Sequence, residues 1–197
     1  MNNNRESYLK AVKNSLEQNI FYHSLALEAC MGGVYDYLKN NNLLKPGELS
    51  KDDWMLAGLI HDIDYAGEFK EFHPNKTKEA LAKFNLKISD NIQQIILAHD
   101  GRQKNVYNNK AKWAIFCADS LTGLIVATAL IYPSKKLADV KISSVLKRFL
   151  KEPRFAAGTR RDEVSQCELP DGLNIPLEKF IEICLVSMQQ IAPEIGL

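Results

Sequence analysis

The stretch AKWAIFCADSLTGLIVATALIY, residues 111–132, is the most apolar part of the chain and ends at Pro133. We predict that it forms one helix, and a helix of this composition should be buried on most of its sides. Its longest predominantly apolar run, residues 121–132, has 12 residues, whereas a membrane-spanning helix needs about 20. We therefore expect the central core helix of a soluble protein.

Elsewhere, apolar residues recur at helical spacing and no segment alternates as a half-buried strand would. Residues 64–73 are expected to be irregular. The predicted fold is an all-α helical bundle forming a single domain over residues 1–197, with a core at about 20–132 and a basic helical C-terminal extension at about 134–197. The other predicted helices are 5–18, 20–39, one capped by Ser50, one from Pro74 to Phe84, one from Ser89 or Asp90 to near Gly101, 140–150 and 177–191.

The overall composition is that of a globular protein, with 46% hydrophobic and 25% charged residues. A net charge of +1 gives no general case for binding nucleic acid. The first ten residues are polar, so no signal peptide is expected. The four cysteines form no CxxC pair and are predicted to be reduced core thiols of a cytoplasmic protein.

Residues 134–162 hold nine basic and three acidic side chains, so this segment carries +6 and the remainder −5. Such a segment could attract an anionic substrate. The solvated faces of two helices explain it equally simply, and we favour that interpretation.

The pair His61-Asp62 follows the apolar run Leu56–Ile60. A carboxylate beside such a run is costly in a low-dielectric site unless a cation accompanies it. Histidine with aspartate is a ligand pair suited to iron, manganese or zinc. By itself this dipeptide is a weak signal, since it occurs by chance in many proteins.

Asp119 interrupts the apolar helix predicted at 111–132. A buried carboxylate needs a cation or several hydrogen-bond donors. Gly123 lies one turn later on the same face and leaves space beside it. A structural ion pair with a lysine or arginine is the alternative to a metal site.

The three remaining histidines have simple structural explanations when each is taken alone. His23 fits a buried core histidine. His73 precedes Pro74 and is expected at a helix N-cap, where the helix dipole favours the neutral, metal-binding imidazole; an exposed loop position is equally acceptable. His99 fits the end of a helix, where the dipole favours a charged imidazole.

Taken together, the order His23, His61-Asp62, His73, His99 and Asp119 resembles the H…HD…D pattern of the HD superfamily of metal-dependent phosphohydrolases. Residues 59–64, LIHDID, look like the HDIG-type segment of small bacterial members, with Asp64 where glycine is usual. Residues 118–124 look like the last ligand helix. The resemblance covers about 21–132, and parts of 132–137 and 154–156 are similar to a group of bacterial HD proteins of this size.

The resemblance implies that a first divalent metal is bound by His23, His61, Asp62 and Asp119. A possible second metal would be bound by His73 and His99, with Asp62 bridging the two ions. Iron, manganese, zinc, nickel and magnesium are not distinguished. Asp64 is expected to tighten the turn or to support a ligand from behind.

The function implied is hydrolysis of a small phosphate ester, such as a nucleotide, by metal-activated water, with Asp62 as the catalytic residue that orients the nucleophile. No membrane or nucleic-acid polymer is expected as a partner. Lys76 and Arg102 could contact phosphate, although solvated surface positions fit them better. Two alternatives stay open: a diiron oxygenase using the same six ligands, and a non-catalytic regulator that binds a metal or nucleotide. A P-loop or dinucleotide enzyme is not supported, since neither glycine motif is present.

Overall fold

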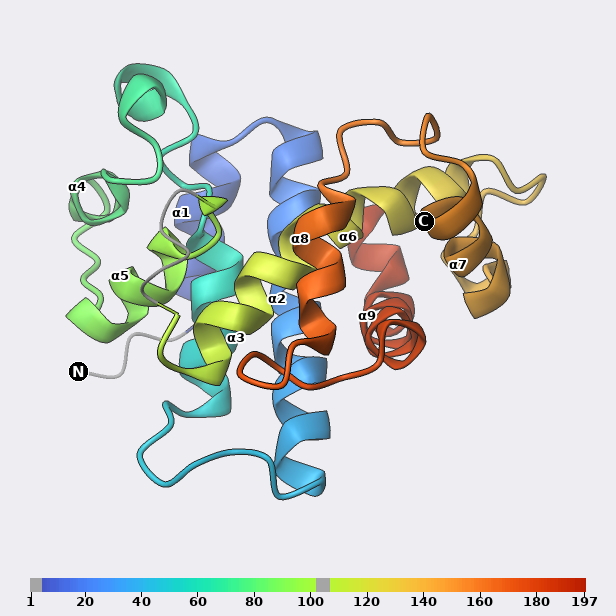
Figure 1. Cartoon of the computed structure of the whole chain (residues 1–197). Helices are drawn as coiled ribbons and strands as arrows, with labels where there is room; N and C mark the ends of the chain where they lie inside the picture. Colours follow the sequence, from blue (N-terminus) through green and yellow to red (C-terminus); the bar gives the residue numbers. More distant parts are fainter. Residues whose placement is uncertain (1–4, 102–106) are drawn as a thin grey trace.

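The structure is a computed structural model that describes residues 5–101 and 107–197. Over these residues the chain consists of helices and connecting segments, without a β-strand, so the all-α prediction is confirmed (Figure 1). The α-helices are α1 (Arg5–Ser15), α2 (Gln18–Asn40), α3 (Lys51–Ile60), α4 (Thr77–Ala82), α5 (Asp90–Leu97), α6 (Lys110–Leu130), α7 (Ile142–Lys151), α8 (Arg161–Val164) and α9 (Leu177–Gln190). Short 3₁₀ helices are η1 (Gly67–Phe72), η3 (Leu137–Asp139), η4 (Ser165–Glu168) and η5 (Ala192–Ile195).

Helix α6 lies in the interior, as its composition predicts. Fourteen of its 21 residues are buried, and it contacts α2, α5, α7, α8 and α9. The whole helix is longer than its apolar run, so by length and composition alone it would also pass for a membrane-spanning helix. However, 67% of its most apolar window is buried inside the protein.

Two of the predicted helix starts are confirmed by hydrogen bonds. The Ser50 hydroxyl accepts from the backbone N–H of Asp53, whose side chain in turn accepts from the backbone N–H of Ser50, which completes a capping box. The Ser89 hydroxyl accepts from the backbone N–H of Ile92. The boundary between the first two predicted helices, 5–18 and 20–39, lies earlier than predicted, because α1 ends at Ser15 and α2 begins at Gln18.

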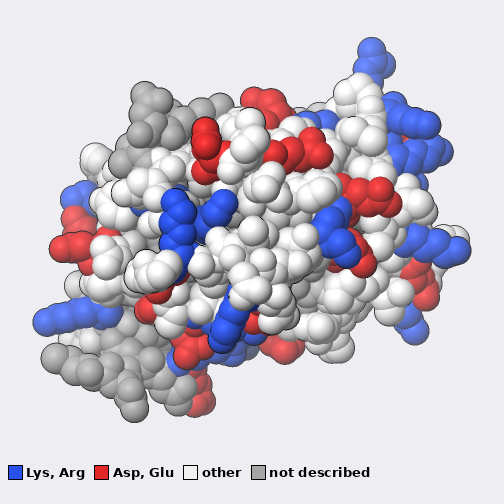
Figure 2. Space-filling model, turned by 60° about the horizontal axis from the view of Figure 1, so that its bottom comes forward, with Lys and Arg blue, Asp and Glu red and all other residues white. Residues whose placement is uncertain are grey.

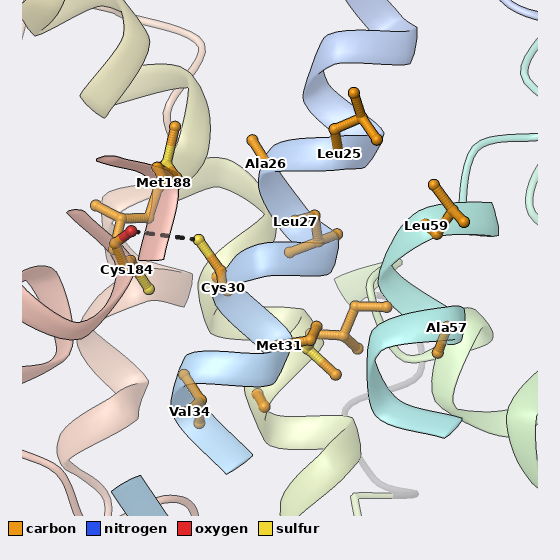
Figure 3. Close-up of a cluster of buried hydrophobic side chains, with 14 of the residues drawn as sticks. Leu25, Ala26, Leu27, Cys30, Met31, Val34, Ala57, Leu59, Cys184 and Met188 are labelled. Carbon is orange, nitrogen blue, oxygen red and sulfur yellow. Dashed lines mark hydrogen bonds between the residues drawn. The ribbon is translucent and has the colours of Figure 1, made fainter. Parts of the chain in front are cut away.

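Helix α2 packs closely between α3 and α9, and glycines allow the approach. A Cβ added to Gly58 of α3 would lie 2.9 Å from the backbone nitrogen of Glu28, and one added to Gly33 would lie 2.0 Å from the Ser187 hydroxyl of α9. Figure 3 shows the side chains of α2 meeting both neighbours, with Leu27 and Met31 toward α3. The close contact brings the end of α3 against the middle of α2.

The four cysteines are free and buried, which agrees with the prediction of core thiols. The Cys30 thiol of α2 lies 3.8 Å from the backbone carbonyl of Cys184 in α9 (Figure 3). Burial raises the pKa of the Cys184 and Cys117 thiols well above the usual value.

The helix predicted to begin at Pro74 begins only at Thr77. His73 is therefore not an N-cap; it follows η1, and residues 73–76 form turns. The Lys76 backbone N–H donates to Asp64 Oδ2 at 2.8 Å instead of entering a first helical turn. The segment 64–73, predicted to be irregular, contains η1.

The C-terminal helices pack against the helices of the predicted core. Helix α9 packs on α2, and α8 lies along α6 (Figure 1). The Arg161 guanidinium, at the start of α8, donates to the carbonyl oxygens of Phe149 at 3.1 Å and Phe155 at 2.6 Å. These bonds tie the end of α7 and the loop that follows it to the start of α8.

Charges are mixed over the surface. Basic and acidic side chains are interspersed on the face drawn in Figure 2. Within the basic segment, Lys147 Nζ lies 3.6 Å from Glu152 Oε1, and the Arg161 guanidinium donates to backbone carbonyl oxygens. These contacts fit the interpretation of solvated and structural side chains for Lys147 and Arg161.

Candidate metal centre

Six polar side chains from five separate parts of the chain meet at one place. Helix α2 supplies one histidine, the end of α3 supplies the His-Asp pair, the turn after η1 and the segment after α5 supply one histidine each, and α6 supplies an aspartate. These are the six residues that the sequence predicted as ligands: His23, His61, Asp62, His73, His99 and Asp119.

The first group lies between α2, α3 and α6. The Nε2 atoms of His23 and His61 are 3.1 Å apart. Asp119 Oδ1 lies 2.9 Å from His23 Nε2 and 3.7 Å from His61 Nε2. Asp62 Oδ2 lies 3.2 Å from His61 Nε2. These four atoms are close enough for His23, His61 and Asp62, with Asp119 beside them, to hold a metal ion.

The second group lies on the other side of the same aspartate. The Nε2 atoms of His73 and His99 are 3.0 Å apart. Asp62 Oδ1 lies 3.5 Å from His73 Nε2 and 4.0 Å from His99 Nε2. Asp62, His73 and His99 could therefore hold an ion of their own, and the two oxygens of Asp62 face the two groups.

Each imidazole is oriented by an acceptor at its other nitrogen. The Nδ1 atom of His61 lies 2.8 Å from the Gly58 carbonyl, and that of His99 lies 2.6 Å from the Ile96 carbonyl. A carbonyl oxygen can only accept, so both Nδ1 atoms carry the proton. His99 does lie at a helix end, where its Nδ1 contacts a last-turn carbonyl and its Nε2 faces the cluster. The charged form expected there is not favoured, because burial and the charge of His61 lower the pKa of His99 to about 4.

The Nδ1 atoms of His73 and His23 also face hydrogen-bond acceptors. Asp64 Oδ1 accepts from His73 Nδ1 at 2.7 Å. The Thr122 hydroxyl donates to the backbone carbonyl of Asp119 at 2.8 Å, so it accepts from His23 Nδ1 at 2.9 Å. In its neutral form, each of the four imidazoles would therefore direct an Nε2 lone pair into the cluster. Two lone pairs at about 3 Å repel each other unless a proton or a metal ion lies between them.

Burial and charge oppose each other in the cluster. Burial by itself would lower the pKa of His61, but the charges of Asp62 and Asp119 outweigh it and raise this pKa to about 9. Burial would raise the pKa of Asp62, but His61 holds it well below its usual range. At His99, burial and the charge of His61 lower the pKa to about 4. The cluster thus retains cationic charge among its carboxylates.

Asp64 occupies the position where the HD resemblance expects glycine. Its side chain is fully buried, and it accepts from His73 Nδ1 and from the Lys76 backbone N–H. It therefore supports His73 from behind and closes the turn at residues 73–76.

Arg160 and Glu163 were not singled out by the sequence. Arg160 Nη2 donates to Asp119 Oδ2 at 2.7 Å, and Arg160 Nε donates to Glu163 Oε2 at 2.5 Å. The ion pair with an arginine, given above as the alternative to a metal site, is therefore present at Asp119 Oδ2, while Oδ1 faces the histidine cluster. The sequence signal was the basic segment 134–162, which did not distinguish Arg160 from its neighbours.

A cavity of about 820 Å³ opens onto the cluster. A Cβ added to Gly123, in its wall, would meet no atom within 4 Å, so the predicted space beside Asp119 is present. The Lys76 ammonium is 2.6 Å from Glu79 Oε1, and Lys76 is not among the residues that line the cavity. Arg102 lies outside the described residues. The other lining residues include Tyr65, Pro74, Asp100, Gly101, Ser120 and residues 156–160.

No family model, curated protein or solved structure matches this chain.

Proposed function

We propose that this protein is a metal-dependent hydrolase of the HD type that cleaves a small phosphate ester. The observation that carries the proposal is the arrangement of the four imidazoles. Their Nδ1 atoms are all engaged by acceptors, and their Nε2 atoms form two pairs 3.0 and 3.1 Å apart. Asp62 contributes one carboxylate oxygen to each pair.

The donor set fits borderline divalent metals such as iron, manganese and zinc, because it combines imidazole nitrogen with carboxylate oxygen. The four cysteines are buried away from it, so no thiolate competes for the ion. When bound, such an ion lowers the pKa of a coordinated water and offsets charge on phosphoryl oxygens.

The protein residues perform three tasks in this proposal. His23, His61, His73 and His99 are held by their Nδ1 partners, so that little reorganisation is needed on binding. Asp62 lies between the two groups and is the residue that orients the attacking water. The cavity leaves room for a substrate beside Gly123.

The expectation that the substrate is a nucleotide or another phosphate ester comes from the HD resemblance. The cavity of about 820 Å³ lies within the size range of small-molecule sites and would admit such a substrate. A diiron oxygenase would use the same six residues, and oxygen dependence separates the two activities. Binding without turnover would indicate a regulator.

The experiment is metal analysis of protein purified without chelator, followed by a screen of phosphomonoesters, phosphodiesters and nucleotides under air and under strict anaerobiosis. The proposal expects bound divalent metal and phosphate release that does not require oxygen. The matched variants are Asp62→Ala in the cluster and Asp90→Ala, which removes a surface carboxylate paired with Lys78. Only the first should abolish hydrolysis. Full activity of Asp62→Ala, or a wild type that holds no divalent metal, would refute the proposal.

A further inference from the structure

The Arg160 guanidinium is held along one edge by two buried carboxylates. Its Nη2 donates to Asp119 Oδ2 at 2.7 Å and its Nε donates to Glu163 Oε2 at 2.5 Å. Both carboxylate side chains are 11% exposed, whereas the Arg160 side chain is 45% exposed. The guanidinium is therefore fixed in direction by buried partners while part of it faces solvent.

The other edge of the same guanidinium is unused within the described part of the protein. Nη1 makes no hydrogen bond to any residue that the structure describes, and Nη2 retains a second hydrogen. Arg160 lines the cavity next to Asp119 and Gly123. Since nothing lies within 4 Å of a Cβ added to Gly123, the cavity is open on this side.

The charges around the cavity show why an arginine is needed there. Among the described lining residues, Arg160 is the only lysine or arginine, against four carboxylates: Asp62, Asp100, Asp119 and Glu163. If the lining imidazoles are counted as neutral, these five charged side chains give the cavity a net charge of −3, which repels a phosphate. Two bound divalent ions would change the net charge of the cavity to +1. Without Arg160, the four carboxylates and the two ions would sum to zero.

We propose that the outer edge of Arg160, formed by Nη1 and Nη2, is an oxyanion-binding subsite that contacts the phosphoryl group of the substrate. This inference rests on the proposed phosphohydrolase function and assigns one residue of the binding site. An arginine edge matches two oxygens of a phosphate, and fixing the guanidinium beforehand reduces the entropy lost on binding. Arg160 thus takes the role that the sequence suggested for Lys76 and Arg102.

A purely structural role for Arg160 predicts a different result. If it served only to hold Asp119, its removal would lower metal content and leave the phosphate affinity of the loaded protein unchanged. Metal content and phosphate affinity are therefore measured separately.

The test uses the full chain loaded with Mn²⁺ and titrated calorimetrically with inorganic phosphate. The variants are Arg160→Gln, Arg160→Lys and Arg154→Gln. Arg154 is the matched control, because it lies in the same basic segment, is exposed, and is not among the residues lining the cavity. Each glutamine variant removes the same charge, so a difference between them is not a general electrostatic effect.

We expect Arg160→Gln to bind manganese in the wild-type ratio and to raise the Kd for phosphate about tenfold or more, as for the loss of a charge-assisted hydrogen bond. Arg160→Lys should fall between it and the wild type, because a lysine keeps the charge but lacks the planar fork. Arg154→Gln should match the wild type.

An unchanged phosphate Kd in manganese-loaded Arg160→Gln would overturn the subsite, whether or not metal content falls. Equal weakening in Arg154→Gln would overturn it too. A wild type that holds no manganese would contradict the metal centre itself, and metal analysis detects this before phosphate is added.

Discussion

The Gly58 carbonyl accepts the Nδ1 proton of His61 at 2.8 Å, and the same glycine lies against the backbone of α2 at Leu27 and Glu28. One residue therefore sets both the spacing of two helices and the direction of an imidazole. Packing and site geometry are coupled at the last turn of α3.

Replacing Gly58 with alanine should destabilise the fold. The new Cβ would lie 2.9 Å from the Glu28 backbone nitrogen and 3.0 Å from the Glu28 Cα, and backbone cannot move aside as a flexible side chain can. Overpacking of this kind costs about 1–3 kcal/mol. Urea unfolding of the metal-free protein measures it.

Gly123→Ala is the matched control for Gly58→Ala. Both glycines lie in helices, but the added Cβ at Gly123 meets nothing within 4 Å. Its stability should be unchanged or raised by up to about 1 kcal/mol through helix propensity. Equal destabilisation of the two variants would show that the close approach at Gly58 is not what matters.

Much of the fold follows from local signals in the sequence. The apolar composition of residues 111–132 and the caps at Ser50 and Ser89 define their helices without reference to the rest of the chain. The start of α4 could not be predicted in this way. It depends on Asp64, a residue far from α4 in the sequence, whose Oδ2 accepts the hydrogen bond of the Lys76 backbone N–H.

The candidate site was predictable to a similar extent. Asp119 stood out because a carboxylate is anomalous within an apolar helix, but the full set of candidate ligands came from the order of histidines and aspartates that resembles the HD pattern. Arg160 carried no such signal, since an arginine in a basic segment is ordinary. Its role depends on the tertiary fold, where α8 lies along α6 and brings Arg160 to Asp119.

Removing one histidine of the second group should reduce the metal content by one ion per chain at most. His99→Gln loses the Nε2 that faces His73 at 3.0 Å but leaves the contacts of His23, His61 and Asp119 intact. Protein loaded with excess metal, desalted and analysed by mass spectrometry should fall from two ions to one. One ion per chain in both the wild type and His99→Gln would indicate a site with a single metal.

Asp64→Asn should weaken the second group without removing any ligand. Asp64 orients His73 through its Nδ1, and loss of such a supporting carboxylate typically costs about 10–100-fold in metal affinity. Competition with a fluorescent chelator measures the loss. Asp90→Asn, at a surface ion pair with Lys78, supplies the control. If both variants retained wild-type affinity, Asp64 would not support the ligand.

Metal binding should release protons and strengthen as the pH rises. In the metal-free cluster burial acts to lower the pKa of His61, but Asp62 and Asp119 raise it to about 9, so His61 is protonated at pH 7 and a metal ion must displace that proton from Nε2. Below pH 9 each further drop in pH favours the competing proton, and the apparent affinity therefore falls from pH 9 to pH 6. Calorimetry in two buffers of different ionisation enthalpy should show different observed heats at pH 7, and the difference gives the number of protons released. Identical heats in both buffers, together with an affinity independent of pH, would mean that the ion does not bind at these nitrogens.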